Sequence, residues 1–232
     1  MIKFLCAVLS NLLLCCFAFA GVANVGNGGD VIYCPGNLSE VYYSLDFVLA
    51  RAQLENSTKI IQVDSLNQST ERISRLLESK VPSLKNSFDH FVSEFRNQDS
   101  SRTYLWKPSR LELPDIQDEN FKRFPRGVCA QIQAQPWGAE QFQAVIRTKT
   151  IENGVTKTNF EYDRFILAEV ERTNPTQLSF VLVHEWLWNY NSNVRSNRII
   201  NYLLHSEQFE KQTSAQVTQE LTNLGLVNIT AP

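Results

Sequence analysis

The chain lacks the patterns that mark several large classes of protein. Beyond its first twenty residues it has no run of eighteen uninterrupted apolar residues, so no membrane-spanning helix is predicted there. It has neither the glycine-rich patterns of phosphate-binding loops nor the G-x-S-x-G turn of many serine hydrolases. Strongly basic patches are absent and the formal net charge is −2, so neither nucleic acid nor an anionic membrane is a predicted partner.

The N-terminus has the features of a bacterial secretory signal peptide. Lys3 supplies the positive charge, residues 4–17 are mostly apolar, and residues 18–20 read Ala-Phe-Ala, a small-x-small cleavage site. We therefore expect residues 1–20 to be removed. The mature protein then begins at Gly21 and is exported, either to the periplasm or out of the cell.

Cysteine is scarce in the mature chain. Three of the five cysteines (Cys6, Cys15 and Cys16) lie in the signal peptide, which leaves Cys34 and Cys129. In an oxidising compartment two thiols most simply form one disulfide. It would close a loop of about a hundred residues, for which chain entropy suggests roughly 4–5 kcal/mol of stabilisation. No C-x-x-C pattern supports a catalytic or metal-binding thiol.

Hydrophobic periodicity predicts an α+β fold, with helices at both ends and a small antiparallel sheet between them. Helical spacing covers residues 38–54, 69–96 with a break near Pro82, and three C-terminal segments at about 175–190, 193–205 and 214–224. Strand-like patterns cover residues 31–33, 104–106, 129–135, 142–150 and 155–162, with a hairpin turn at Asn153-Gly154. No linker-like tract or repeat divides the chain, so residues 21–232 are predicted to form one domain.

A glycine-rich segment precedes the first predicted strand. Residues 26–30 read Gly-Asn-Gly-Gly-Asp, and the glycines suit a tight turn. Asp30, at the end of this segment, is a candidate ligand or hydrogen-bond anchor.

The helix at 175–190 carries the main candidate site. It is apolar on nearly every side, yet His184 and Glu185 stand in its middle, and buried ionisable groups need partners. The pair begins the H-E-x-x-H signature of zinc peptidases, in which Glu185 would be the catalytic base. Trp188 replaces the second histidine, and tryptophan is not a zinc ligand. Ser179 in the same helix has no base predicted beside it.

Two interpretations of this helix follow. In the structural one, which we favour, Glu185 pairs with Arg195 or Arg198 of the next helix and fixes how the two helices dock. In the other, a divergent zinc-dependent hydrolase uses His184 and His205 as metal ligands. The predicted helical hairpin places those two histidines several residues out of register, or about 9 Å, which weakens the metal site.

One set of short elements resembles a known group of proteins. The elements are the segment at 26–30, Cys34, the strand with Cys129, Gln131 and Gln135, the helix with Gln177, His184 and Glu185, and the following helix with Arg195, Arg198 and His205. In these elements the chain resembles exported proteins without an assigned activity from Gram-negative predatory bacteria. The resemblance implies export and a single domain, and it carries over no catalytic residue. On the structural interpretation of the helix at 175–190, we expect a non-enzymatic periplasmic or secreted binding or structural component without a cofactor. The alternative is the zinc-dependent hydrolase.

Overall fold

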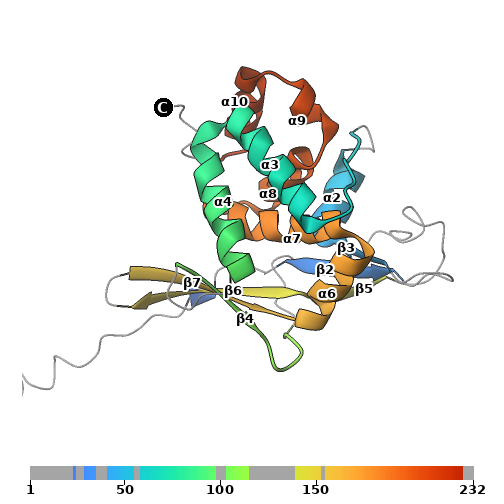
Figure 1. Cartoon of the computed structure of the whole chain (residues 1–232), viewed down its shortest axis with the longest axis vertical. Helices are drawn as coiled ribbons and strands as arrows, with labels where there is room; N and C mark the ends of the chain where they lie inside the picture. Colours follow the sequence, from blue (N-terminus) through green and yellow to red (C-terminus); the bar gives the residue numbers. More distant parts are fainter. Residues whose placement is uncertain are drawn as a thin grey trace, which may run out of the picture.

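A bent sheet carries most of the helices on one face in this α+β fold, which confirms the predicted fold class (Figure 1). The computed structural model describes residues 23–24, 29–34, 41–54, 58–97, 103–114, 139–152 and 155–226. Within these ranges no helix combines the length and the apolar character needed to cross a membrane.

Within the described residues, seven strands form two adjoining sheets. The strands are β1 (Ala23–Asn24), β2 (Asp30–Cys34), β3 (Val41–Ser44), β4 (Tyr104–Pro108), β5 (Glu140–Gln143), β6 (Val145–Glu152) and β7 (Val155–Tyr162). One sheet has the order β1-β6-β7-β4 and the other β3-β2-β5. Ala144 joins them: its amide donates to the carbonyl of Gly29 (3.1 Å), and its carbonyl accepts from the amide of Asp163 (2.9 Å). The two sheets therefore behave as one bent layer.

The predicted strands are confirmed where the structure describes them. The hairpin around Asn153-Gly154 is borne out by the antiparallel pairing of β6 with β7, which ends at Glu152 and Val155. One detail of the antiparallel prediction was wrong, because β4 runs parallel to β7. The predicted strand at 129–135 lies outside the described residues.

The N-terminal helices are α2 (Leu45–Gln53), α3 (Leu66–Lys80) and α4 (Pro82–Asn97). The break between α3 and α4 lies where Pro82 was expected to cause it, since proline lacks the amide that would continue the first helix. The helix predicted at 38–54 begins later than expected. Residues 41–44 pair with β2 instead, so strand pairing overrides their helical spacing.

The C-terminal helices are α6 (Arg164–Thr173), α7 (Pro175–Leu187), α8 (Val194–Leu204), α9 (Glu207–Lys211) and α10 (Ser214–Asn223). Sequence periodicity predicted α7, α8 and α10, and the last ends before Gly225, whose φ of 82° suits glycine. It missed α9 and α6. The carboxylate of Asp163 caps α6 by accepting from the amides of Phe165 (2.9 Å) and Ile166 (3.0 Å).

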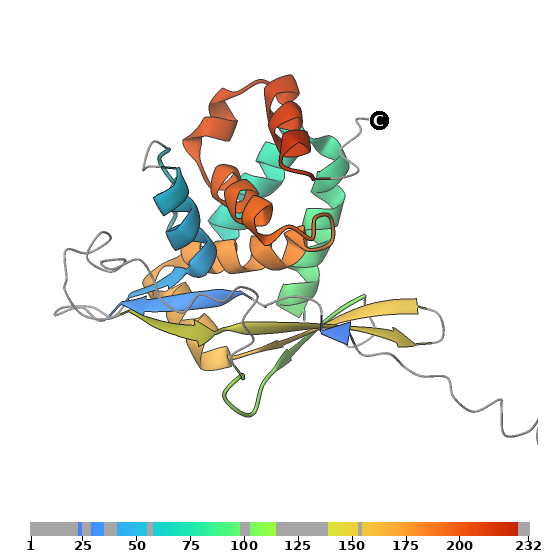
Figure 2. The same ribbon diagram turned by 180° about the vertical axis from the view of Figure 1, so that it is seen from behind.

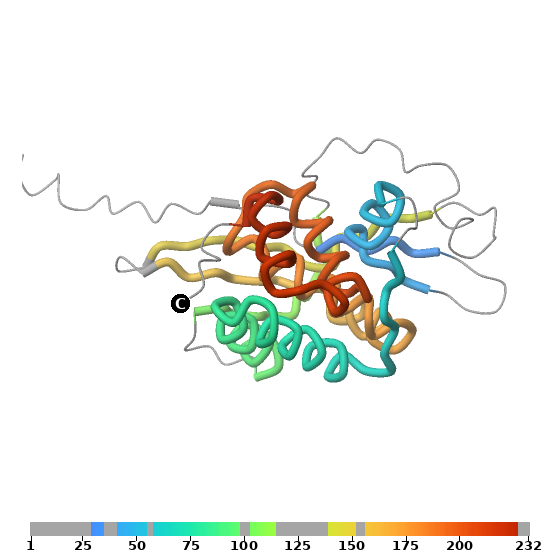
Figure 3. Tube along the Cα trace, turned by 90° about the horizontal axis from the view of Figure 1, so that it is seen from above, coloured from blue at the N-terminus to red at the C-terminus, as the bar shows by residue number. Residues whose placement is uncertain are grey.

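Helix α7 lies between the sheet and the layer formed by α3, α8 and α10 (Figures 1 and 2). Seen from above, α8 to α10 cover the middle of the strands, with α3 and α4 along one side and α2 on the other (Figure 3). The aromatic core lies between α4, α7 and the sheet, where Trp106 stacks on Phe160 with ring centroids 4.2 Å apart. This position puts every side of α7 in the protein interior.

Candidate functional site

Every residue of α7 from Thr176 to Leu187 is buried, which matches its apolar sequence. The polar side chains on this helix contact five other parts of the chain. Three of them accept hydrogen bonds from backbone amides: Thr176 from Val63, Gln177 from Ser44 and Glu185 from Gly29. The other two contact side chains: Ser179 contacts His205, and His184 contacts Asp46. Because an unpaired buried polar group destabilises the fold, these contacts constrain how each element packs on α7.

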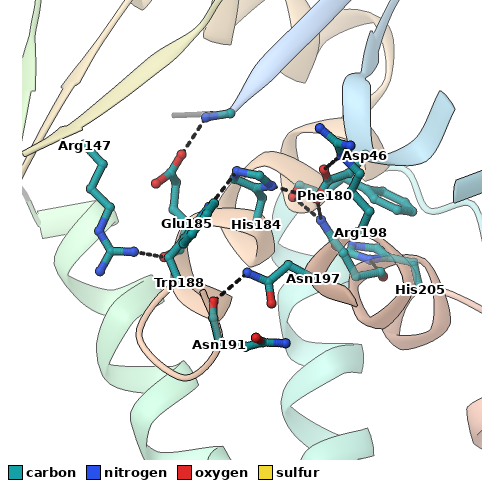
Figure 4. A network of polar contacts seen from close by, with 12 residues as sticks. Asp46, Arg147, Phe180, His184, Glu185, Trp188, Asn191, Asn197, Arg198 and His205 are labelled. Carbon is teal, nitrogen blue, oxygen red and sulfur yellow. Dashed lines mark hydrogen bonds and ion pairs between the residues drawn. The ribbon is translucent and has the colours of Figure 1, made fainter. Parts of the chain in front are cut away.

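His184 is held at both ring nitrogens (Figure 4). Its Nδ1 lies 2.8 Å from the Oδ2 atom of Asp46, and the indole Nε1 of Trp188 donates to its Nε2 over 3.0 Å. An indole N–H only donates, so Nε2 must accept and the proton belongs on Nδ1. His184 is thus a neutral imidazole whose two polar atoms both have protein partners.

Asp46, in the first turn of α2, is the acceptor for several groups. Oδ2 also accepts from Asn201 (2.8 Å), and Oδ1 forms an ion pair with Nε of Arg198 at 3.5 Å. Burial opposes ionisation of this carboxyl, but His184, Arg198 and Asn201 together lower its pKa below the usual 3.8. Asp46 is therefore a buried carboxylate that joins α2, α7 and α8.

The predicted pairing of Glu185 with Arg195 or Arg198 was wrong. Arg198 pairs with Asp46, and Arg195 is exposed whereas Glu185 is completely buried. Adjacent residues on a helix point about 100° apart, so His184 and Glu185 face different neighbours. His184 faces α2, and Glu185 faces the start of β2.

Glu185 reaches the backbone at Gly29. Its Oε1 accepts from the Gly29 amide, and Oε2 is buried without a hydrogen-bond partner among the described residues. Burial raises the pKa of this carboxyl to about 7, although the charge of Arg147 and the hydrogen bond from the Gly29 amide oppose the rise. A Cβ at Gly29 would lie 2.6 Å from Cγ1 of Val181, so only glycine lets the strand approach α7 this closely.

Arg147 of β6 is the arginine beside Glu185. It donates from Nη1 to the Glu185 backbone carbonyl (3.2 Å) and from Nη2 to Oδ1 of Asn189 (2.6 Å). Its side chain is completely buried and lies over the ring of Phe160 at 5.7 Å. Burial lowers the pKa of Arg147, and the charge of Glu185 partly offsets that effect. This contact fastens the end of α7 to the sheet.

Ser179 and His205 form a second buried contact. Nδ1 of His205 lies 2.8 Å from the carbonyl of Asn201, and Nε2 lies 2.9 Å from Oγ of Ser179. The carbonyl only accepts, so Nδ1 carries the proton and Nε2 accepts from the serine hydroxyl. The expectation that Ser179 has no base beside it was therefore wrong. Burial lowers the pKa of His205 to about 3, and the imidazole also stacks on Phe180 with centroids 3.8 Å apart.

The two candidate zinc ligands are engaged elsewhere. His205 contacts Ser179, which precedes His184 by roughly 7.5 Å along the axis of α7. Both nitrogens of each histidine already have hydrogen-bond partners. Within the described ranges, no group of three or more His, Cys, Asp or Glu side chains is placed to hold a metal ion.

The remaining candidates lie near β2. Asp30 is buried, and its Oδ2 accepts from Nε2 of Gln141 (2.6 Å) on the neighbouring strand β5, in keeping with a hydrogen-bond anchor. Cys34 is buried at the end of β2. Cys129 lies outside the described residues, so the Cys34–Cys129 disulfide stays a prediction.

Sequence reasoning missed Asp46 and Arg147. Asp46 is directly flanked in sequence by Leu45, Phe47 and Val48, and an acidic residue among apolar neighbours in a helix is a signal for a buried partner. Arg147 carries a similar signal, because it follows Val145 on the buried face of its strand. Neither signal identifies which distant residue is the partner.

Comparisons of the chain with protein-family models, with curated proteins and with solved structures found no match.

Proposed function

We propose that the mature chain is an exported, non-enzymatic binding or structural component in which α7 organises the fold. The observation that supports this role is that both ring nitrogens of His184 and of His205 are hydrogen-bonded to protein groups. Imidazoles that act on substrates or metals keep one nitrogen available for that purpose. Here both imidazoles join secondary-structure elements.

The chemistry of Ser179 also favours a structural role. The hydroxyl is completely buried, so a substrate has no access to it. A general base works best with a pKa near the operating pH, and the pKa of His205 is about 3. The Ser179–His205 contact therefore positions α8 against α7 and does not activate a nucleophile.

A divergent zinc-dependent hydrolase is the second candidate. Asp46 contacts Nδ1 of His184, as carboxylates do behind zinc-bound histidines, and the pKa of Glu185, about 7, suits a general base. For zinc to bind His184 through Nε2, the indole of Trp188 would have to leave that nitrogen. The structural role needs no such rearrangement.

Metal analysis separates the two candidates. The mature protein would be purified without chelators, exchanged into metal-free buffer with an equimolar amount of zinc, and analysed for bound zinc beside a Glu185→Gln variant. We expect no stoichiometric zinc and no zinc-dependent hydrolysis of a mixed set of fluorogenic peptides. Zinc bound at one ion per chain, with hydrolysis lost in a Glu185→Gln variant that still folds, would overturn the proposal.

Export is tested separately. The complete chain, expressed in a Gram-negative host, would be recovered from the cytoplasmic, periplasmic and medium fractions, and its N-terminus sequenced. We expect most of the protein outside the cytoplasm, starting at Gly21. Protein that stays in the cytoplasm and still carries residues 1–20 would contradict export.

A further inference from the structure

A short ridge projects from the face of the sheet opposite the main helical layer. The chain leaves β4 and turns below the strands over residues 109–114, near the start of α6 (Figures 1 and 2). A hollow of about 560 Å³ lies on one side of this segment, over Ile146 and Thr148 of β6. A hollow of about 320 Å³ lies on its other side, between the segment and Phe165 of α6. We call residues 109–114 the ridge.

The ridge and the smaller hollow expose apolar side chains. Leu111 is 81% exposed and Phe165 is 68% exposed, and both line the smaller hollow. The third exposed large apolar side chain of the described residues is Ile151 (55%), which lies far along the β6–β7 hairpin. Tyr42 and Phe142 add aromatic surface to the same hollow. Clustered exposed apolar groups of this kind mark protein contact surfaces.

Opposite charges stand on either side of Leu111. Arg110 and Glu112 are both exposed, and neither forms an ion pair with another described residue. One surface thus carries an apolar residue between a cation and an anion, and it presents a ridge beside a hollow. A two-fold axis near Leu111 would therefore place each of these charges opposite its counterpart in a second copy.

We propose that this face joins two copies of the chain in a symmetric dimer. A two-fold axis brings the same patch of both copies together, so a self-complementary surface satisfies its symmetry. Leu111 of each copy enters the hollow beside Phe165 of the other, and Arg110 of each meets Glu112 of the other. The charge balance distinguishes this occupant from a strongly acidic or basic partner. The proposal does not depend on the role of α7.

Sedimentation velocity over a wide range of concentrations tests the apolar contact. We expect reversible dimers of the mature chain. Leu111→Asp and Phe165→Asp should each weaken dimerisation by about tenfold or more, because each buries a charge in the contact. Ile151→Asp is the matched control and should leave the dimer unchanged. Unaltered urea midpoints would show that all three variants fold.

A charge exchange identifies the partner as a second copy. Arg110→Glu and Glu112→Arg should each weaken the dimer, whereas the double variant should recover it, since both charges are then reversed on both copies. A chain that is monomeric at every concentration would overturn the proposal. It would also be overturned if Leu111→Asp and Phe165→Asp left the dimer intact. The same holds if the double charge variant dimerised as weakly as the two single charge variants.

Discussion

Trp188, the residue that follows the last residue of α7, donates its indole N–H over 3.0 Å to Nε2 of His184, four residues earlier in the chain. Trp188 occupies the sequence position at which a zinc peptidase has its second histidine. The indole therefore covers the nitrogen that a metal would use, and Asp46 holds the other nitrogen at 2.8 Å. In this protein the His-Glu pair links α7 to α2 and to the strand that follows Gly29.

Replacing Glu185 by glutamine should change the pH dependence of stability. The pKa of Glu185 is about 7 in the folded protein and 4.5 ordinarily, so between these values the folded state holds a proton that the unfolded state has released. The free energy of unfolding then falls as pH rises from 4.5 to 7, by up to roughly 3 kcal/mol. Urea unfolding should show Glu185→Gln more stable than the parent at pH 8 and similar to it near pH 4.5. A parent that is the more stable of the two at pH 8 would contradict this.

His205 should produce the opposite slope. Its pKa falls from 6.5 to about 3 on folding, so the unfolded state binds the extra proton and stability rises with pH across this interval. Between pH 4.5 and 6.5 the slopes of His205 and Glu185 nearly cancel in the parent protein. In Glu185→Gln the opposing slope of Glu185 is removed, so the rise due to His205, about 1.4 kcal/mol per pH unit, becomes visible. A stability profile of that variant that stays flat over this interval would rule out the buried, neutral imidazole.

Removing Asp46 should cost a large part of the stability. Asp46→Ala takes the acceptor from His184, Arg198 and Asn201 at once, and breaking a buried ion pair costs about 3–5 kcal/mol. Chemical denaturation measures the loss. The control is Asp64→Ala, at an exposed aspartate, which should change stability by no more than about 0.5 kcal/mol. Equal effects of the two substitutions would show that Asp46 does not join the helices.

Gly29→Ala should destabilise the protein by about 1–3 kcal/mol, the usual cost of overpacking a core. The added methyl would meet Val181, 2.6 Å away, and push the Gly29 amide from the carboxylate of Glu185. Val181→Ala makes room, so the double variant should lose less than the sum of the two single losses, as measured by urea midpoints. Strict additivity would mean that the two positions do not touch.

Local sequence signals predicted much of the fold. Pro82 marks the break between two helices, Asn153-Gly154 lies at the turn of a hairpin, and Gly225 follows the last helix. These features were predictable because each depends on the backbone preferences of only one or two residues. The signal for α6 was present in Asp163, a good helix cap, but the apolar stretch after it resembles a strand. Short apolar runs are ambiguous between the two structures.

The partners around α7 were not predictable in the same way. The sequence identified His184 and Glu185 as buried groups in need of partners, and the structure agrees. The arginine beside Glu185 is Arg147 on a strand, and Arg198 belongs to Asp46. Which elements come into contact depends on how the sheet and the helices pack. Patterns within a short stretch of sequence do not specify that packing.

The protonation state of His184 distinguishes an imidazole that holds two helices together from a metal ligand. Long-range ¹H–¹⁵N NMR of the three histidine rings, assigned by substituting each one, reports which nitrogen carries the proton. We predict that His184 is protonated at Nδ1 and bare at Nε2 at neutral pH, and that neither a chelator nor equimolar zinc changes its signals. A proton on Nε2, or a His184 signal that shifts when zinc is added or removed, would contradict it.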